Sequence, residues 1–256
     1  MSSIYLETAL AAARAAEKVV RKYWQQNVDI TIKADASPVT VADVETEEAI
    51  KAVILKQFPD HGFYGEETGK TRADAEYTWL VDPIDGTKSF VREYPFFSTQ
   101  IALMRGDDLI LGVSSAPVFG EYAYAEQGGG AFWVDKEAKV SRIDTVAAAT
   151  LSVGNLKTLA ANPTGWAGLA SMVREVNRAR GYGDFYHYHL LARGAIDLVV
   201  ESDVNVLDIA ALSVIIRQAG GVFTDLEGKP VGLETTTVCA AATSALHSEA
   251  RRRLGY

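Results

Sequence analysis

The chain has 256 residues and a formal net charge of −8, and hydrophobic residues make up 48% of it. This composition allows a sizeable core, in one large domain or in two closely packed halves, and it excludes wholesale disorder. Lys and Arg do not cluster as a duplex-binding surface requires, apart from three arginines at 251–253, so we expect no nucleic-acid partner. An acidic protein that binds anions commonly needs a cation between its own carboxylates and the anion. The negative net charge therefore favours a bound metal ion.

The only cysteine, Cys239, lies in an apolar stretch, which predicts a core residue and fits a reducing compartment without disulfides. Charged residues at Glu7, Arg14 and Glu17 interrupt the N-terminal segment. A signal peptide needs an unbroken apolar centre, and a membrane span needs about 20 apolar residues. We therefore expect a cytoplasmic protein without a membrane partner.

The first half of the chain predicts two helices and then a sheet. The long N-terminal segment is Ala-rich and amphipathic, and the second helical pattern is closed by a proline beyond its end. We expect, in chain order, helices at 3–26 and 40–58, a strand at 76–82, two strands within 97–117 joined by a Gly-Asp-Asp turn, and more sheet at 120–135.

The second half alternates helices and strands. We expect a strand at 150–155, helices at 165–179 and 184–194, a strand at 195–202, a helix at 207–221, strands at 222–228 and 237–243, and a helix at 244–254. The alternation predicts an α/β or α+β fold with two stacked sheets. The change near residue 135 predicts two subdomains, 1–135 and 136–256, without a flexible linker and with the functional site between them.

Residues 79–90, WLVDPIDGTKSF, place two acids at the end of a predicted buried strand. Asp82 ends the strand, Pro83 fixes φ, and the chain then turns so that Asp85 can face the same point. The turn also exposes the Ile84 carbonyl, and Gly86 lets the backbone approach a ligand closely. Carboxylate and carbonyl oxygens are the ligands that Mg²⁺ prefers, so this stretch predicts a magnesium site.

Thr87 and Lys88 predict the start of a short helix, whose first N–H groups can hold a phosphate. The alternative is an acid-rich turn in which Asp82 and Asp85 only cap this helix. A phosphorylated-aspartate mechanism of the haloacid-dehalogenase type needs an acid two residues before Asp85, and Pro83 stands there. The spacing therefore favours a metal-activated water over an aspartyl-phosphate.

Three acids elsewhere in the chain are candidates for the same site. Glu66, the first of two glutamates after a short strand, is a metal ligand or part of a solvated loop. Asp208 begins a largely apolar helix, where it is a first-turn acid or a ligand from the opposite half of the molecule. Asp43 follows Thr40 in an [ST]-x-x-[DE] capping pattern and is also a candidate helper at the metal.

Together, GEE at 65–67, WLVDPIDGTKSF at 79–90 and LDIAALSVIIRQAGG at 207–221 resemble the inositol monophosphatase family. The similarity runs from the first helix to the last, in the same order and spacing. It implies a magnesium-dependent, lithium-sensitive phosphatase with the layered α-β-α-β-α sugar-phosphatase fold, and it implies a homodimer.

The resemblance also implies roles for individual residues. The implied metal ligands, for two or three Mg²⁺ ions, are Glu66, Asp82, Ile84 through its carbonyl, Asp85 and Asp208. The residues implied to orient the attacking water are Glu66 and Thr87, with Asp43 as the candidate helper. The backbone amides of Gly86 and Thr87 match the family's phosphate-binding groups, and Glu201 matches the position that contacts the alcohol part of the substrate.

Two segments, 82–103 and 180–201, look more like the histidinol-phosphate phosphatase branch than the inositol branch. Histidinol phosphate carries an ammonium, which a carboxylate in the alcohol pocket would pair with by a charge-assisted hydrogen bond. Asp184 is the candidate, with Glu201 beside it, although Asp184 could also be a simple helix N-cap. Leu207 departs from the family's usual Trp, from which we expect a changed pocket shape rather than lost metal binding.

Two other features predict structure rather than chemistry. His187 and His189 are two residues apart on a predicted helix, so they do not form the i, i+4 pair of a zinc helix, and we interpret them as structural or rim residues. The three glycines at 128–130 lack a following Lys-Ser/Thr pair and predict a tight turn.

We therefore expect a phosphomonoesterase that acts on a small-molecule phosphate monoester, with L-histidinol phosphate as the first candidate. Inositol monophosphate, other sugar phosphates and 3′-phosphoadenosine nucleotides are alternatives. A catalytically silent metal- or phosphate-binding protein is the rival from another functional class.

Overall fold

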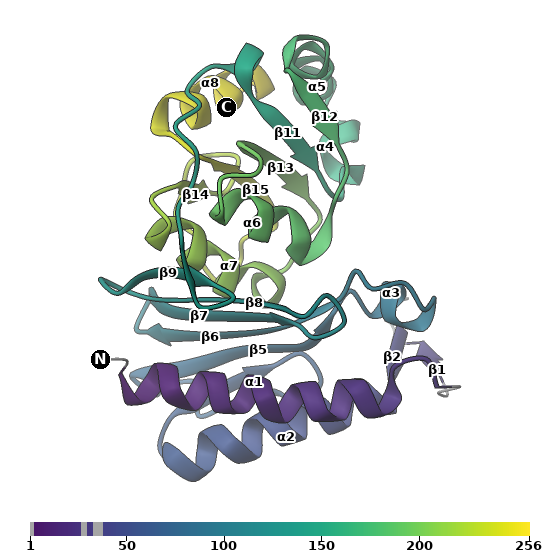
Figure 1. The fold of residues 1–256 in the computed structure, drawn as a ribbon, viewed down its shortest axis with the longest axis vertical. Coiled ribbons are helices and arrows are strands. Elements are labelled where there is room, and N and C mark those ends of the chain that lie inside the picture. The colour runs from purple at the N-terminus through teal and green to yellow at the C-terminus, as the bar shows by residue number, and fades with distance from the viewer. Residues whose placement is uncertain (1–2, 27–29, 33–37) are drawn as a thin grey trace.

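Five layers of helix and sheet alternate along the long axis of the computed structural model (Figure 1). The structure describes residues 3–26, 30–32 and 38–256. Helices α1 (Ile4–Tyr23) and α2 (Val41–Gln57) form the first layer, and α6 (Asp184–Ala192) and α7 (Val206–Gln218) lie between two sheets. This order confirms the expected α-β-α-β-α fold.

The first sheet has eight strands in the order β10-β9-β8-β7-β6-β5-β3-β4, antiparallel except for the parallel pair of β3 and β5. Its strands are β3 (Gly62–Gly65), β4 (Gly69–Thr71), β5 (Tyr77–Asp85), β6 (Ser98–Arg105), β7 (Asp108–Ala116), β8 (Glu121–Glu126), β9 (Gly130–Trp133) and β10 (Lys136–Ala138). The short helix α3 (Thr87–Val91) follows β5, and β1 (Ile30–Ile32) pairs with β2 (Pro38–Thr40) in a separate ribbon.

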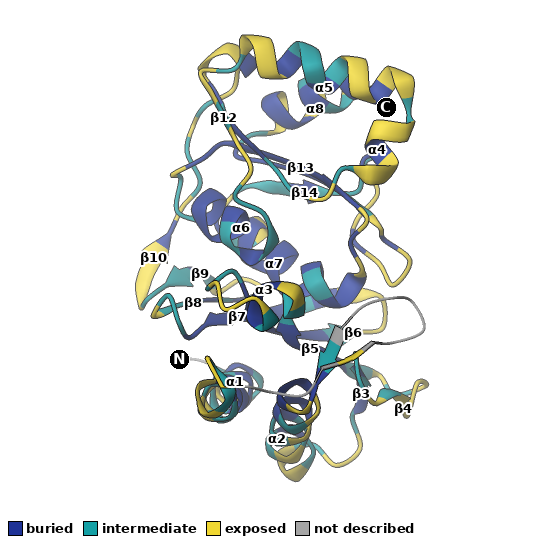
Figure 2. Cartoon of the chain, turned by 90° about the vertical axis from the view of Figure 1, so that its right-hand side faces the viewer, coloured by how far each residue is buried: buried dark blue, intermediate teal, exposed yellow. Residues whose placement is uncertain are grey.

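The second sheet has five strands in the order β12-β11-β13-β15-β14. Its strands are β11 (Thr150–Val153), β12 (Arg178–Arg180), β13 (Leu198–Ser202), β14 (Val222–Thr224) and β15 (Thr237–Ala241). The last layer contains α5 (Pro163–Glu175) and α8 (Ser244–Leu254), with α4 (Lys157–Ala161) and the 3₁₀ turn Val146–Ala148 nearby. Figure 2 shows exposed residues on the outer sides of α5 and α8 and buried ones towards the sheet.

The middle layer joins the two halves of the chain. Helix α7 is apolar on nearly all sides, as expected for a helix buried on every face. It packs against the first sheet at Gly112, where a Cβ would lie 2.2 Å from the carbonyl oxygen of Ala211. Its other side contacts β14 of the second sheet. A helix from the second half of the sequence thus completes the core of the first half.

Some boundaries differ from those predicted. The helix expected at 165–179 begins earlier and ends at Glu175, because Val176 turns extended and residues 178–180 pair in parallel with β11 as strand β12. The strand expected at 222–228 ends at Thr224, because the N–H of Gly228 donates to the Asp225 carbonyl and closes a turn. The last strand of the first sheet, β10, extends beyond residue 135 to Ala138. The subdomain boundary expected at 135/136 stays a prediction.

No helix in the described part of the chain combines the length and the apolar character that a membrane crossing needs.

Candidate metal centre and substrate pocket

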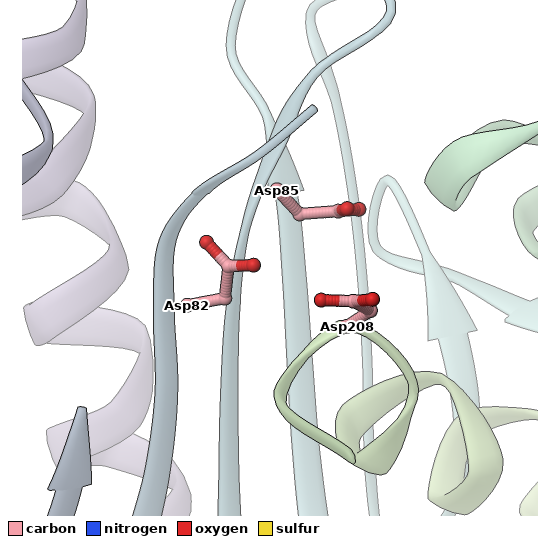
Figure 3. Close-up of side chains that lie close together, drawn as sticks. All are labelled: Asp82, Asp85 and Asp208. Carbon is pink, nitrogen blue, oxygen red and sulfur yellow. The ribbon is translucent and has the colours of Figure 1, made fainter. Parts of the chain in front are cut away.

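Three aspartates from two distant parts of the chain point towards a common centre (Figure 3). Each of Asp82, Asp85 and Asp208 offers one carboxylate oxygen, and these oxygens all lie within 4.8 Å of one another. Asp82 and Asp85 end β5, whereas Asp208 lies in the first turn of α7. Hard oxygen ligands at this spacing suit a divalent cation such as Mg²⁺, so the donor set fits the metal that the sequence predicts.

An irregularity in β5 allows two residues three apart to face the same way. In a regular strand, residues an odd number apart point to opposite faces of the sheet. The pairing of β5 with β6 is regular up to Asp82, which lies opposite Gln100, and then shifts so that Asp85 lies opposite Ser98. Such bulges re-aim a side chain at the end of a strand. The bulge across Pro83 and Ile84 therefore gives the D-x-x-D spacing its geometry.

Asp82 is buried and Asp85 and Asp208 are half-buried, and the close spacing of the three carboxyl groups changes their pKa values. Burial raises the pKa of Asp82 and of Asp85 well above the usual value, and the neighbouring acids raise both further. Burial also raises the pKa of Asp208 to about 7, although the N–H of Asn205 opposes this change. Like charges at this distance destabilise one another, so a cation between them is favoured.

Each of the three aspartates is held by a hydrogen bond. Asp82 Oδ1 accepts from the N–H of Ile84 at 3.0 Å, and Asp208 Oδ2 accepts from the N–H of Asn205 at 2.9 Å. Asp208 thus completes a capping box with Asn205, so its first-turn role holds and its second oxygen remains for another partner. Asp85 Oδ2 accepts from the Ser98 hydroxyl at 3.3 Å.

Helix α3 begins at Thr87, as predicted, but neither aspartate caps it. Its N-cap is Gly86, which has φ 89° and no side-chain cap. A Cβ at Gly86 would lie 2.6 Å from the carbonyl oxygen of Phe96, so glycine is required there for conformation and for space.

Asp43 and Thr87 meet beside the aspartate cluster. Thr87 Oγ1 lies 3.1 Å from Asp43 Oδ1 and 3.0 Å from the Ile84 carbonyl oxygen. Asp43 Oδ2 accepts from both the N–H and the hydroxyl of Thr40 at 2.7 Å, which confirms the capping box. Burial raises the pKa of the Asp43 carboxyl, while these hydrogen bonds oppose the change.

Glu66 lines the same cavity but lies outside the group of three closely spaced carboxylates. It follows β3, and its N–H donates to the Val81 carbonyl at 3.2 Å. The loop that carries it is fixed by Glu47, a buried residue of α2 that sequence reasoning missed. The two carboxylate oxygens of Glu47 accept from the N–H groups of Glu67 and Thr68 at 2.8 and 2.9 Å. The signal in the sequence was an acid on the apolar face of α2, one turn after Asp43.

Asp184 and Glu201 line the same cavity as the cluster, and the cavity has a volume of about 670 Å³. Asp184 is not an N-cap: Gly183 takes that position, and Asp184 itself has φ 45°, a strained conformation for a residue other than glycine. Burial and the charge of Glu201 raise the pKa of Asp184 to about 6.

Glu201 is held by two residues of α6 and by the segment that follows β11. Its Oε2 accepts from the Tyr188 hydroxyl at 2.7 Å and lies 3.2 Å from His187 Nε2, and its Oε1 accepts from the N–H of Asn155 at 3.1 Å. Burial would raise the pKa of Glu201, but these partners together lower it. A Cβ at Gly154 would lie 1.8 Å from Glu201 Oε1, so this approach also requires glycine.

His187 and His189 are both fully buried, which confirms the structural interpretation over a position on the rim. Cys239 is a buried core residue, as predicted. Leu207 is buried in the middle core and is not among the residues that line the cavity, and the changed pocket shape expected from it stays a prediction.

The cavity has a strongly acidic wall. The charged residues that line it, among those described, are Lys88 and seven acids: Glu66, Asp82, Asp85, Asp184, Glu201, Asp203 and Asp208. An anionic ligand enters such a cavity only together with cations, and a ligand that carries its own positive charge is favoured.

The chain is similar to proteins from several bacteria. It is 36% identical to the histidinol-phosphatase of Mycobacterium tuberculosis, over 99% of this chain and 99% of that protein. It is 35% identical to the histidinol-phosphatase of Streptomyces coelicolor, over 90% of this chain and 87% of that protein. The extragenic suppressor protein SuhB of Bartonella henselae has a similar structure, with a TM-score of 0.89, 28% identity and 98% of each chain covered.

The model of the inositol monophosphatase family matches residues 2–254. Because this match and the two relatives of about 35% identity cover nearly all of the sequence, the chain belongs to the inositol monophosphatase family.

Proposed function

We propose that this phosphoric monoester hydrolase cleaves L-histidinol phosphate to L-histidinol and phosphate in a magnesium-dependent reaction. The observation that carries the proposal is the presence of two acidic groups in one cavity. Asp82, Asp85 and Asp208 converge on one point, and Asp184 and Glu201 line the same cavity beside them. The histidinol-phosphatases among its relatives support the same substrate.

The residues proposed to hold two or three Mg²⁺ ions are Glu66, Asp82, Asp85, Asp208 and the carbonyl of Ile84. When bound, the ions supply positive charge that neutralises the phosphate and makes water a better nucleophile. The pKa values of the aspartates support this assignment, because a cation would offset the repulsion that raises them.

The residues proposed to orient the attacking water are Thr87 and Glu66, with Asp43 as helper. Thr87 Oγ1 has two acceptors within reach, Asp43 Oδ1 and the Ile84 carbonyl, and its single hydrogen bonds to one of them, which leaves its lone pairs to accept a hydrogen from water. Two hydrogen bonds from Thr40 hold Asp43, so this arrangement is fixed before any ligand arrives. The N–H groups of Gly86 and Thr87 are proposed to hold phosphate oxygens.

Asp184 and Glu201 are proposed to bind the ammonium of L-histidinol. An alcohol without positive charge would leave the half-buried Asp184 carboxylate, beside the charge of Glu201, without a cationic partner, which is costly. A substrate ammonium would instead make charge-assisted hydrogen bonds with them. This difference favours histidinol phosphate over inositol monophosphate.

The test is phosphate release from L-histidinol phosphate and from inositol-1-phosphate, with Mg²⁺ or with EDTA, by the wild type, Asp184→Asn and the exposed-turn control Asp107→Asn. We expect Mg²⁺-dependent release, fastest from histidinol phosphate. Loss of one charge-assisted hydrogen bond, about 1.5–3 kcal/mol, predicts a 10- to 100-fold lower kcat/KM for Asp184→Asn with histidinol phosphate only.

Equal loss on both substrates would contradict the ammonium assignment. If the wild type has a higher kcat/KM for inositol-1-phosphate than for histidinol phosphate, inositol-1-phosphate is the better candidate substrate. No release from either substrate in Mg²⁺ would refute both of these substrates and leave the other phosphate monoesters as candidates. A cytoplasmic homodimer stays our expectation, and sedimentation of the purified protein tests the dimer.

A further inference from the structure

A network of hydrogen-bonded polar side chains extends from the metal cluster across the first sheet. From Asp85 it runs to Ser98 and Gln100 on β6, then to Ser114 on β7 and His189 on α6. It ends at Glu121 on β8, which also accepts from the indole N–H of Trp133 at 3.1 Å. The three side chains in the middle, Gln100, Ser114 and His189, are fully buried.

The direction of each hydrogen bond in this network follows from donor chemistry. The Glu121 carboxylate only accepts, so His189 Nδ1, at 3.4 Å, is the donor to it. Neutral His189 then accepts at Nε2 from the Ser114 hydroxyl at 2.9 Å. Burial lowers the pKa of His189, which agrees with the neutral form.

The hydrogen-bond directions near Asp85 follow from donor chemistry in the same way. Gln100 Nε2 donates its two hydrogens to Ser114 Oγ at 3.1 Å and to Ser98 Oγ at 2.8 Å. The Ser98 hydroxyl, having accepted this hydrogen bond, directs its own hydrogen to Asp85 Oδ2. Both ends therefore give one consistent arrangement, and Gln100 is the double donor at its centre.

Asp85 depends on this network more than the other two aspartates depend on side chains. Backbone N–H groups hold Asp82 and Asp208, and a backbone group cannot rotate away. In the described part of the molecule, the only hydrogen bond to the Asp85 side chain from another residue comes from Ser98. A serine hydroxyl rotates freely unless a second partner fixes it, and Gln100 is that partner.

Gln100 also lowers the stability of the folded protein in a way that an apolar side chain at this position would not. Its Oε1 is buried without a hydrogen-bond partner among the described residues. An unpaired buried polar atom costs about 1–3 kcal/mol, and an apolar side chain of similar size would remove that cost. Stability alone therefore does not account for an amide at this position.

We propose that Gln100 is a positioning residue for the metal ligand Asp85 and that it acts through Ser98. The pair holds the Asp85 carboxylate in the orientation that faces Asp82 and Asp208, and His189 extends the same support from α6. The proposal rests on the proposed function only in taking Asp85 as a magnesium ligand. Hydrogen bonds that orient metal ligands commonly change metal affinity 10- to 100-fold when they are removed.

The test is the rise in Tm as Mg²⁺ is added to EDTA-treated protein without substrate, read as the Mg²⁺ concentration at half the rise. The variants are Ser98→Ala, Gln100→Leu and the double variant, with Ser98→Thr as the conservative change that keeps a hydroxyl. Ser213→Ala is the matched control, because Ser213 is buried on α7 and its hydroxyl donates only to the Ala210 carbonyl.

We expect the Mg²⁺ midpoint to rise about tenfold in Ser98→Ala and several-fold in Gln100→Leu, with Ser98→Thr and Ser213→Ala near the wild type. The metal-free Tm of Gln100→Leu should change little, because the unpaired oxygen leaves together with the amide. The double variant should match Ser98→Ala alone, since Gln100 acts through Ser98.

Independent, additive effects of the two substitutions would overturn the proposal, as would an unchanged midpoint in both single variants. If Gln100→Leu does not fold, an unchanged midpoint in Ser98→Ala alone overturns it. A wild type whose Tm does not respond to Mg²⁺ would instead refute the metal site of the proposed function, and this inference with it. The two failures are therefore distinguishable in one experiment.

Discussion

Replacing one aspartate of the metal cluster by asparagine should stabilise the metal-free protein while it abolishes function. Asp85→Asn keeps the shape of the side chain and an oxygen that can accept from Ser98. It removes the negative charge that faces Asp82 and Asp208 within 4.8 Å. Without metal the negative charge of Asp85 destabilises the folded protein by repulsion. With metal bound, the same carboxylate is a ligand.

The magnitude follows from the spacing of the oxygens. Two unit charges at this distance repel by about 3 kcal/mol at an effective dielectric constant of ~20. Asp85 faces two such neighbours, but the raised pKa values leave the cluster partly protonated near neutral pH. We therefore expect a gain of about 3 kcal/mol at pH 8, equivalent to a metal-free Tm about 6–12 °C higher.

The assay is thermal unfolding at pH 8 in EDTA and in saturating Mg²⁺, together with phosphate release. We expect wild-type Tm to rise with Mg²⁺, Asp85→Asn to respond weakly, and its turnover to fall about 10³-fold, or about 4 kcal/mol. The exposed-turn control Asp107→Asn should behave as the wild type. A metal-free Asp85→Asn that is less stable than the wild type would refute the repulsion argument, and ordinary turnover would refute the ligand assignment.

Three further predictions concern other residues. Glu47→Gln should raise the Mg²⁺ midpoint of the Tm rise about tenfold with the fold retained, because it loosens the loop that carries Glu66; an unchanged midpoint would contradict this. Gly154→Ala should lower kcat/KM for histidinol phosphate at least tenfold by displacing Glu201, with the Mg²⁺ midpoint unaffected; equal kinetics would argue against that pocket. Burial lowers the pKa of His247 from ~6.5 to about 4, so its stability contribution is present above pH 6.5 and is lost as pH falls towards 4. Urea unfolding at pH 7 and pH 5 should show the wild type losing about 1–2 kcal/mol more than His247→Gln; equal losses would show that His247 does not titrate in this range.

The layered fold follows largely from local patterns. The alternation of strands and helices predicts both sheets, and the boundary errors occur where strand pairing or a turn overrides periodicity. Residues 178–180 continue a helical pattern but pair with β11, because the edge of the second sheet offers them backbone partners. Short strands such as β4 and β10 carry too few residues for any period to be visible.

The candidate site is predictable in part. Spacing alone brings Asp82 and Asp85 to one strand end, but no local pattern shows that Asp208 meets them from more than a hundred residues away; the family resemblance supplied that. The roles of Glu47 and Gln100 cannot be predicted from the sequence, because they depend on hydrogen bonds that form only in the folded structure. A buried acid on an apolar helix face and a glutamine in an apolar strand were the only local signals.

The position of α7 limits how this molecule can admit its ligand. Two-lobed enzymes commonly open by a hinge between rigid bodies, and the candidate pocket lies between parts of both halves. Here α7 is wedged between both sheets, with Gly112 against Ala211, so a hinge would tear apart the largest continuous core. We therefore expect ligand to enter and leave without a change in the relative positions of α7 and the two sheets.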